Sequence, residues 1–216
     1  MPSANLTPRS DTVVRRILDA AAEIFAREGY AGARMDEIAR VAQVNKAMLY
    51  YHVGDKTALY EQVLHSALQR NRAIIQDAID HETTGERKLQ ALITTITELA
   101  TTTPHLPRLM LRELACGGTE IPDAVVSDMA AIFTMLRTIL ADGQATERFR
   151  HSNPLMVHLM IVGGIMVMTS GASLGDRVAA QAGIPEVAEG LVSAEAMARQ
   201  MCDTFLHGIL RQKENA

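Results

Sequence analysis

The sequence predicts an all-α protein in which a small N-terminal domain of three helices precedes a larger helical domain. Apolar residues recur at intervals of three and four through most of the chain, as they do on the buried face of an amphipathic helix. Glycine, proline and residues that favour helix N-caps separate these stretches, which is typical of helix ends. We find no stretch that alternates apolar and polar residues as a half-buried strand would.

Length and charge set broad limits on function. A chain of 216 residues can bury roughly 70% of its unfolded surface, so it needs no disulfides to stabilise a core. The net charge of −4 at first argues against a nucleic-acid partner. However, residues 1–56 carry eight Lys or Arg against seven Asp or Glu, and the remainder carries thirteen against eighteen. The first part can therefore present basic groups on one face although the whole chain is acidic.

Cysteine usage and hydropathy indicate where the protein works. Its two cysteines, Cys116 and Cys202, are far apart in the sequence, which favours a reducing compartment over a disulfide framework. The N-terminus lacks the apolar core of a signal peptide. The most apolar stretch, residues 154–168, is too short to cross a bilayer. We therefore expect a cytoplasmic protein with no membrane partner.

The N-terminal residues contain three predicted helices. After a polar arm, residues 1–10, a helix is predicted over residues 11–28 and ends at Gly29, which suits the C′ position. A second, short helix is predicted over residues 34–41, and only three residues separate it from Asn45, a good N-cap for a third. Two short helices joined by so tight a turn form a helix-turn-helix, whose second helix can enter a major groove.

The third predicted helix lies in the stretch VNKAMLYYHVGDK, residues 44–56. Leu49 and Val53 are four residues apart and can point inward together, so the remaining side chains are left largely outward. These outward groups include amines, phenols and an imidazole, which reach phosphates and base edges. Considered by itself, the stretch is equally typical of a polar surface turn.

The preceding residues decide between these alternatives, because together they resemble the tetracycline-repressor (TetR) family. The resemblance is carried by ILDAAAEIFAREGY (17–30), MDEIARVA (35–42) and VNKAMLYYHVGDKTAL (44–59). It implies a homodimeric, ligand-responsive transcription factor, usually a repressor that binds a palindromic operator. It further implies a helix-turn-helix DNA-binding domain in residues 11–55 and a ligand-binding and dimerisation domain in residues 56–216.

The chain departs from the family pattern at two places. Gln43 stands where the turn usually has glycine, and a positive φ at this residue would cost about 1 kcal/mol. Ala33 and Arg34 stand where the second helix usually offers Ser or Thr to a phosphate. Arg34 offers a charged phosphate contact instead.

The resemblance assigns DNA contacts to seven residues, and Arg34, where the chain departs from the family pattern, is the eighth candidate. Lysine at the start of the recognition helix suits guanine O6 and N7, and a small or flexible apolar side chain beside it suits a thymine methyl. The tyrosines, the histidine and the lysine after the Gly-Asp turn are assigned mainly to phosphates. For Tyr50 the alternative is a packed position in the core, and for Met48 the alternative is a role in packing alone. The eight residues are Arg34, Lys46, Ala47, Met48, Tyr50, Tyr51, His52 and Lys56.

The larger domain is predicted to contain six helices. Their expected ranges are 56–80, 86–102, 105–115, 122–142, 154–170 and 193–211, with Gly143 ending the fourth of them. Residues 175–190 are predicted to be a loop with at most one turn of helix. The fifth and sixth are predicted to pair with their copies in a four-helix bundle, the dimer interface of the family. The alternative is that they only cover the core of their own subunit.

Methionine content points to an adaptable apolar cavity in this domain. The chain has twelve Met against four Phe, four Tyr and no Trp, and flexible methionines suit a cavity that accepts varied apolar guests. Each methionine singly is as typical of ordinary core packing. We expect a small, mostly apolar effector. The candidate ligand-binding residues are Leu92, Ile96, Met110, Glu113, Met135, His158 and Met160, of which Glu113 and His158 can orient a polar group unless they are simply ion-paired or exposed.

Other classes of function have little support in the sequence. We find no Ser-His-Asp set, no usefully spaced carboxylate pair and no phosphate loop, so we expect no enzyme and no cofactor. The later histidines and Cys116 lack the spacing of metal ligands, so no metal site is expected. An architectural DNA-binding protein without an effector is the main rival.

Overall fold

The structure is a computed structural model that describes residues 8–170, 172–184 and 193–210. It confirms the all-α fold class: the described residues contain ten helices and one isolated antiparallel bridge, between Phe149 and Leu210. Residues 1–7 of the expected arm lie outside the described residues, and Pro8 already begins the first helix.

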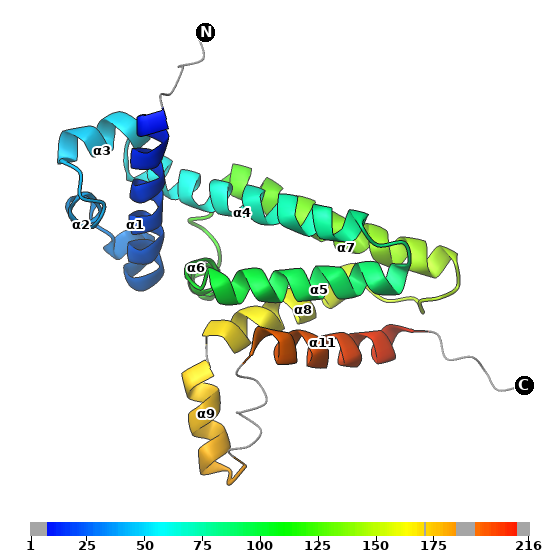
Figure 1. The fold of residues 1–216 in the computed structure, drawn as a ribbon. Coiled ribbons are helices and arrows are strands. Elements are labelled where there is room, and N and C mark those ends of the chain that lie inside the picture. The colour runs from blue at the N-terminus through cyan, green and yellow to red at the C-terminus, as the bar shows by residue number, and fades with distance from the viewer. Residues whose placement is uncertain (1–7, 171, 185–192, 211–216) are drawn as a thin grey trace, which may run out of the picture.

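Three helices form a head at one end of the molecule, and the others form an elongated body (Figure 1). The head consists of α1 (Pro8–Gly32), α2 (Met35–Val41) and α3 (Lys46–Val53). The body begins with α4, which runs from the head along the body. The body helices are α4 (Lys56–Asp80), α5 (Gly85–Thr102), α6 (His105–Ala115), α7 (Asp123–Ala145), α8 (Pro154–Ser170), α9 (Ala172–Gln181) and α11 (Ala194–Ile209).

Local chemistry explains the ends of the head helices. Gly29 has a φ of 74°, which interrupts α1 one turn before its last residue. The Asn45 side chain caps α3 by accepting the Met48 N–H at 2.7 Å. Gln43, between α2 and α3, has a φ of 55°, so the strain expected at this non-glycine position is present.

One apolar core joins the head to the body. The buried side chains Ile24, Phe25 and Leu49 belong to a cluster that also includes Leu109 of α6 and Val125 of α7. A second cluster fills the body between α5, α7, α8 and α11. The first cluster thus continues from the head into the body, and α6 packs against α1 within it.

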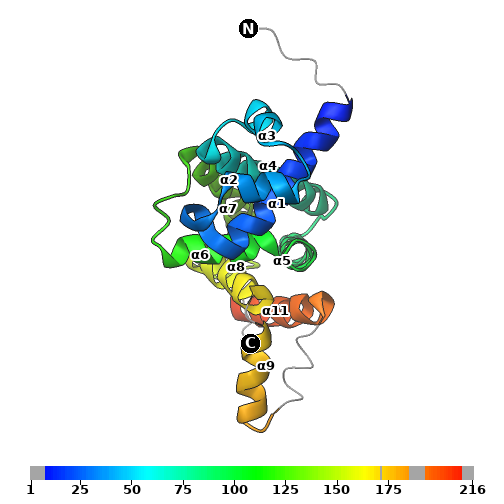
Figure 2. The same ribbon diagram turned by 90° about the vertical axis from the view of Figure 1, so that its left-hand side faces the viewer.

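The body has a layered arrangement. In Figure 1, α4 and α7 lie side by side and α5 runs beneath them, with α11 along its lower face. In both views α9 projects away from the other helices (Figures 1 and 2). The helix α7 is long and apolar enough to cross a membrane by length and composition, but it packs against α4, α5 and α8 and so serves the core of this protein.

Two sequence-based predictions for the body were wrong. Gly143 does not end α7, which continues to Ala145; a Cβ at Gly143 would lie 2.1 Å from Phe149 Cδ2, so this glycine makes room for a ring. Residues 175–181 of the expected loop belong to the helix α9 (Ala172–Gln181), and residues 185–190 of that loop lie outside the described residues. Several apolar residues of α9 are exposed, so this segment lacks the buried apolar stripe by which a helix is predicted from sequence.

Candidate nucleic-acid interface and ligand cavity

The third helix of the head presents most of the predicted DNA-contact residues to solvent. Leu49 and Val53 are buried and attach α3 to the core of the head. Met48, Tyr50 and Tyr51 are 40%, 42% and 85% exposed, so neither Met48 nor Tyr50 occupies the core position that was the alternative. Ala47 is also exposed, and the ring of the half-buried His52 lies edge-on to that of Tyr51, 5.2 Å between centroids.

Lys46 has a partner within the head. Its Nζ lies 2.7 Å from Asp36 Oδ1 on α2, and both side chains are exposed. The hydrogen bond and charge of each group act on the other, so the pKa of Lys46 is raised and that of Asp36 is lowered. Exposed ion pairs of this kind contribute little to stability. A base or phosphate can therefore replace Asp36 as the partner of Lys46.

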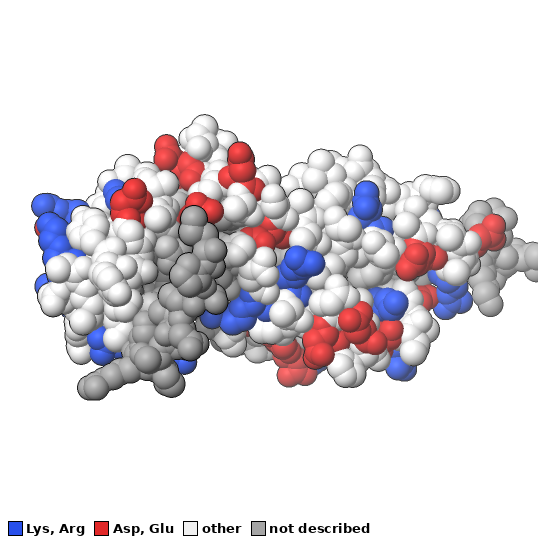
Figure 3. Space-filling model, turned by 90° about the horizontal axis from the view of Figure 1, so that it is seen from above, with Lys and Arg blue, Asp and Glu red and all other residues white. Residues whose placement is uncertain are grey.

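Arg34 and Lys56 flank α3 on either side. Arg34 precedes α2 in an extended conformation, and its exposed side chain caps nothing. Lys56 is half-buried: its Nζ donates to the Ala31 carbonyl at 3.1 Å and lies 4.8 Å from the centre of the Tyr30 ring. Lys56 therefore joins α4 to the end of α1, and it also follows the exposed face of α3 closely in the sequence. Blue side chains gather at the end of the molecule that carries α2 and α3 (Figure 3).

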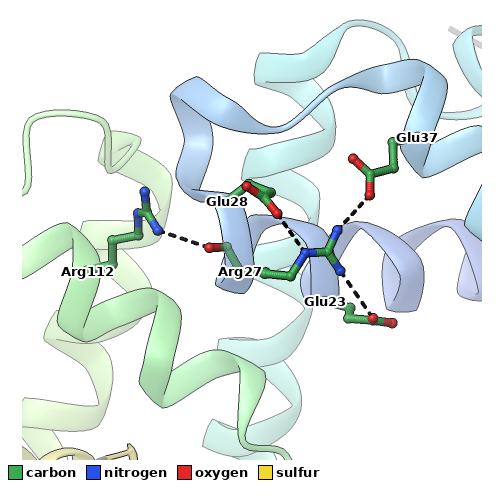
Figure 4. A network of polar contacts seen from close by, with 5 residues as sticks. All are labelled: Glu23, Arg27, Glu28, Glu37 and Arg112. Atoms are coloured by element: carbon green, nitrogen blue, oxygen red, sulfur yellow. Dashed lines mark hydrogen bonds and ion pairs between the residues drawn. The ribbon is translucent and has the colours of Figure 1, made fainter.

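A network of charged side chains joins α1 to α2 (Figure 4). The Arg27 guanidinium lies 2.7 Å from Glu28, 2.6 Å from Glu37 on α2 and 3.5 Å from Glu23. These acidic neighbours raise the pKa of Arg27, and the hydrogen bond that Arg27 donates to Glu28 contributes most. The network adds exposed polar contacts to the buried apolar cluster that already packs α2 against α1.

The same end of α1 is held by a residue of the body. Arg112 of α6 donates from Nη1 to the Arg27 carbonyl at 3.1 Å, and its side chain approaches the end of α1 in Figure 4. A Cβ at Gly29 would lie 2.3 Å from Arg112 Nε, so the glycine is required for this close approach as well as for its positive φ. Arg112 thus satisfies a carbonyl that the interruption of α1 leaves free.

Beneath this contact a tyrosine and a glutamate are buried together. Tyr60 of α4 packs edge-on to Phe25, 4.9 Å between ring centroids, and Glu113 of α6 is only 4% exposed. Burial raises the pKa of Tyr60, and the Glu113 carboxyl adds to this rise. Glu113 therefore faces the head, away from the cavity described next.

A small cavity of about 100 Å³, partly open to solvent, lies where five body helices meet. It is apolar except for Asn71 of α4 and His158 of α8. Its lining residues are Leu68, Asn71, Ile75, Ile96, Leu99, Ala100, Leu106, Pro107, Met110, Met129, Ile132, His158, Val162, Ile165 and Met166. A larger groove of about 810 Å³ between α1, α4 and the start of α6 is open to solvent and lined by charges of both signs, so it suits an apolar ligand less well.

The structure brings three of the seven predicted ligand-binding residues to this cavity: Ile96, Met110 and His158. Leu92 is buried in the core of the body, and Met135 lines a shallow groove between α4 and α7. Met160 is 57% exposed on the outer face of α8. Sequence analysis missed Asn71, although its spacing from Leu68 and Ile75 places all three on one face of a helix.

Two further contacts fix α4 and α8 in the body. Asp128 of α7 is buried and accepts from Gln69 Nε2 at 2.8 Å, while His65 Nδ1 lies 2.6 Å from its other oxygen. The ring of His158 lies edge-on to that of Phe133 of α7, 5.4 Å between centroids. Burial lowers the pKa of His158, which favours the neutral imidazole.

The outer face of α8 is an exposed apolar surface. Gly163, in the middle of this helix, has nothing within 4 Å of a Cβ position. The outward face of α11 is polar instead, because its apolar residues pack against α5. The exposed apolar residues of α8 are Leu155, Met156, Leu159, Met160 and Val167, and Leu174 and Val178 continue this surface onto α9.

Comparisons with known proteins cover both parts of the chain. A family model described as bacterial regulatory proteins, tetR family, matches residues 17–63, and one described as tetracyclin repressor-like, C-terminal domain, matches residues 86–182. The negative transcriptional regulator IcaR of Staphylococcus aureus (strain Newman) is 43% identical over 47 residues, 22% of this chain and 25% of IcaR. That match thus spans about a quarter of the length of the relative. RutR, a transcriptional regulator of Escherichia coli (strain K12), is 26% identical over 147 residues, 68% of this chain and 69% of RutR.

Solved structures share the fold. The ketosteroid transcriptional regulator KstR2 of Mycobacterium tuberculosis superposes with a TM-score of 0.70 at 19% identity, over 92% of this chain and 96% of KstR2. The regulator FadR of Bacillus subtilis, in complex with stearoyl-CoA, gives a TM-score of 0.64 at 22% identity, over 83% of this chain and 98% of FadR. At these identities the likeness concerns the fold.

Proposed function

The chain belongs to the TetR family of bacterial regulatory proteins, and on this premise we propose that it is a homodimeric repressor released from its operator by a small, mostly apolar effector. The family consists of DNA-binding regulators of transcription rather than enzymes. One observation carries the proposal: the cavity is walled by α4, which continues into the head, by α6, which contacts the head, and by α8, which has the exposed apolar face.

DNA recognition is assigned to α3 and its flanks. In this proposal the exposed face of α3 enters the major groove, with Lys46, Ala47 and Met48 at the bases and Tyr50, Tyr51 and His52 mainly at phosphates. Arg34 and Lys56 contact phosphates on either side. A dimer would place two copies of α3 on successive major grooves, about 34 Å apart, and would therefore select a palindromic operator.

The dimer interface is assigned to α8, with α11 beside it. Contiguous apolar surface is uncommon on monomeric proteins, and the outer face of α8 supplies it in a row one helical turn apart. Gly163 allows two copies of α8 to approach closely. The side chain of Met201 of α11 lies near Gly164, so pairing α8 across a two-fold axis brings two copies of α11 to the edge of a four-helix bundle.

The effector is assigned to the cavity of the body. An engineered cavity of about 150 Å³ in another protein accepts benzene, so one of about 100 Å³ must expand to admit even a small ring. That expansion displaces α4 or α6, and each of them contacts the head. Coupling of about 1–3 kcal/mol between effector and operator is typical of such regulators. The relatives named for ketosteroid regulation and solved with stearoyl-CoA support an apolar effector.

Selection of duplexes from a random pool tests this proposal. The purified full-length chain, first shown by light scattering to be a dimer, is expected to enrich a palindrome whose half-sites lie about one helical turn apart. Repeating the selection against a panel of apolar metabolites is expected to identify compounds that release the bound duplex. A monomer, or a dimer without sequence preference at moderate ionic strength, would contradict the proposal. So would a selective dimer that no compound releases, because it would fit an architectural protein instead.

A further inference from the structure

The two polar side chains of the cavity have no hydrogen-bond partner within the described chain. Asn71 and His158 lie on α4 and α8 and line the same small space, and His158 contacts only the Phe133 ring through its own ring. An amide offers two donors and an acceptor, and a neutral imidazole offers one of each. Both side chains are half-buried, so a ligand that covers them removes their remaining contact with water and must offer hydrogen bonds in its place.

Charge at the cavity limits which groups can bind there. Its lining residues include no Asp, Glu, Lys or Arg among those the structure describes. A buried ion without an opposite charge or several hydrogen bonds is strongly disfavoured. The neutral His158, whose pKa burial lowers, does not supply that charge.

From this geometry we propose that the ligand of the cavity is an uncharged apolar molecule with a single hydroxyl or carbonyl group, which is held between Asn71 and His158. This inference rests on the proposed function, because it assigns a chemical class to the proposed effector. A hydroxyl can donate to one side chain and accept from the other, and a carbonyl can accept from both.

The rest of the wall suits the apolar part of such a ligand. Met110, Met129 and Met166 come from three helices and line the space that a ring or short chain would enlarge. Unbranched methionine side chains change rotamer at little cost, so they can fit closely around a ligand while α4 or α6 shifts to make room for it. A ligand that bonds to both polar residues would connect α4, the helix that continues into the head, directly to α8.

Matched probes test the assignment on the full-length protein. Phenol and toluene have nearly the same size and differ in a hydroxyl and a methyl group, and benzoate is ionised. Binding of each is measured by calorimetry to the wild type, to Asn71→Leu and to His158→Phe. Gln76→Leu provides a matched control on α4, because Gln76 is exposed and outside the cavity.

We expect the wild type and the control to bind phenol in preference to both toluene and benzoate. Each cavity variant is expected to lose about tenfold of the preference for phenol over toluene while still binding toluene, since one neutral hydrogen bond typically contributes a factor of this order. Thermal melting without probe establishes that the variants are folded. If a variant does not fold, the order of the three probes on the wild type still decides.

Three outcomes would overturn the assignment: no binding of any probe at millimolar concentration, equal or stronger binding of toluene or benzoate by the wild type, or an unchanged ratio in both folded variants. The operator provides a separate readout. If phenol binds with the expected preference but no ligand of this class releases the operator, the chemical assignment stands and the proposed effector function fails.

Discussion

In the head, α3 turns two apolar residues inward and leaves its other side chains in solvent, whereas α8 in the body has apolar residues on every side. Leu49 and Val53 attach α3 to the core, so its outward face, to which DNA contacts are assigned in our proposal, is free of packing constraints. On α8, Ile161 is buried in the core, Val162 lines the cavity and Leu159 faces solvent. In the proposed function, α3 thus separates packing from recognition, while α8 combines core packing with the proposed ligand and partner contacts.

This difference teaches where substitutions should act. A change on the outer face of α3 is expected to alter DNA preference with little effect on folding, because that face contributes little to the core. A change in the body is expected to propagate, because core, cavity and outer face share the same helices. The following variants test this difference between the two regions, in order of decreasing effect.

The largest effect is expected from a charge on the outer face of α8. Leu159→Glu should give a folded monomer whose operator affinity is lower by about 100-fold or more, because the two heads then bind independently. Light scattering measures the mass and fluorescence anisotropy the affinity. Val126→Glu, at an exposed apolar position of α7, is the matched control and should remain dimeric. A dimeric Leu159→Glu protein with normal affinity would remove α8 from the interface.

A smaller effect is expected where the head meets the body. Gly29→Ala should lower the free energy of unfolding by about 1–3 kcal/mol, because the new Cβ has an unfavourable φ and displaces Arg112. Gly117→Ala, where φ is 84° and nothing lies within 4 Å, should show only the backbone cost of about 1 kcal/mol. Denaturant unfolding measures both.

A double-mutant cycle isolates the contact with Arg112. In a protein that already lacks the Arg112 side chain, adding the Gly29→Ala change should cost about as much as Gly117→Ala does in the wild type, since only backbone strain is then added. If instead the two substitutions at this junction are additive, Arg112 does not restrict the position of Gly29.

Substitution of the lysines on and beside α3 should distinguish base contacts from phosphate contacts. Lys46→Ala is expected to lose about tenfold in discrimination at one base pair, whereas Lys56→Ala should weaken binding to all duplexes and flatten the salt dependence by about one unit of slope. Anisotropy titrations over a series of duplexes and salt concentrations measure both. Should neither variant alter the preferred sequence or the slope, these contact assignments are wrong.

The smallest effect is expected from His158 as the pH falls. Its folded-state pKa lies below the ordinary value of 6.5, so the unfolded chain takes up the proton first. The stability associated with the neutral ring is therefore complete above pH 6.5 and declines as the pH falls from there toward the lowered pKa. Melting curves should show the wild type losing stability relative to His158→Phe in that window. If the stabilities of the wild type and His158→Phe change in parallel with pH, the ring of His158 is in contact with water and its pKa is not lowered.

How far the sequence predicts the structure differs between the same two regions. In the head, Asn45 caps α3, Gln43 takes a positive φ and Leu49 is buried, all as local patterns predict. These features depend on residues only a few positions apart. The outward positions of α3 follow from the same spacing, so the candidate DNA-contact residues on this helix could be predicted together.

Several features of the body could not be predicted from such local patterns. Because α8 is apolar all round, spacing could not tell that Met160 faces outward while His158 faces the cavity. Asn71 was missed because a polar residue on a long helix usually lies at the surface. Gly143 was expected to end α7 because nothing nearby in the sequence shows that Phe149 returns to pack against it.

The pairing of Lys46 with Asp36 has a consequence for how the protein would search a chromosome. In the free protein a carboxylate 2.7 Å away already occupies the ammonium assigned to the bases. Any duplex must displace that carboxylate before it can bind the ammonium, so the pair would act as a built-in competitor that weakens target and random association alike. A sequence preference at Lys46 would then come only from the difference between the hydrogen bonds of a matching guanine and those of the phosphate that every duplex offers.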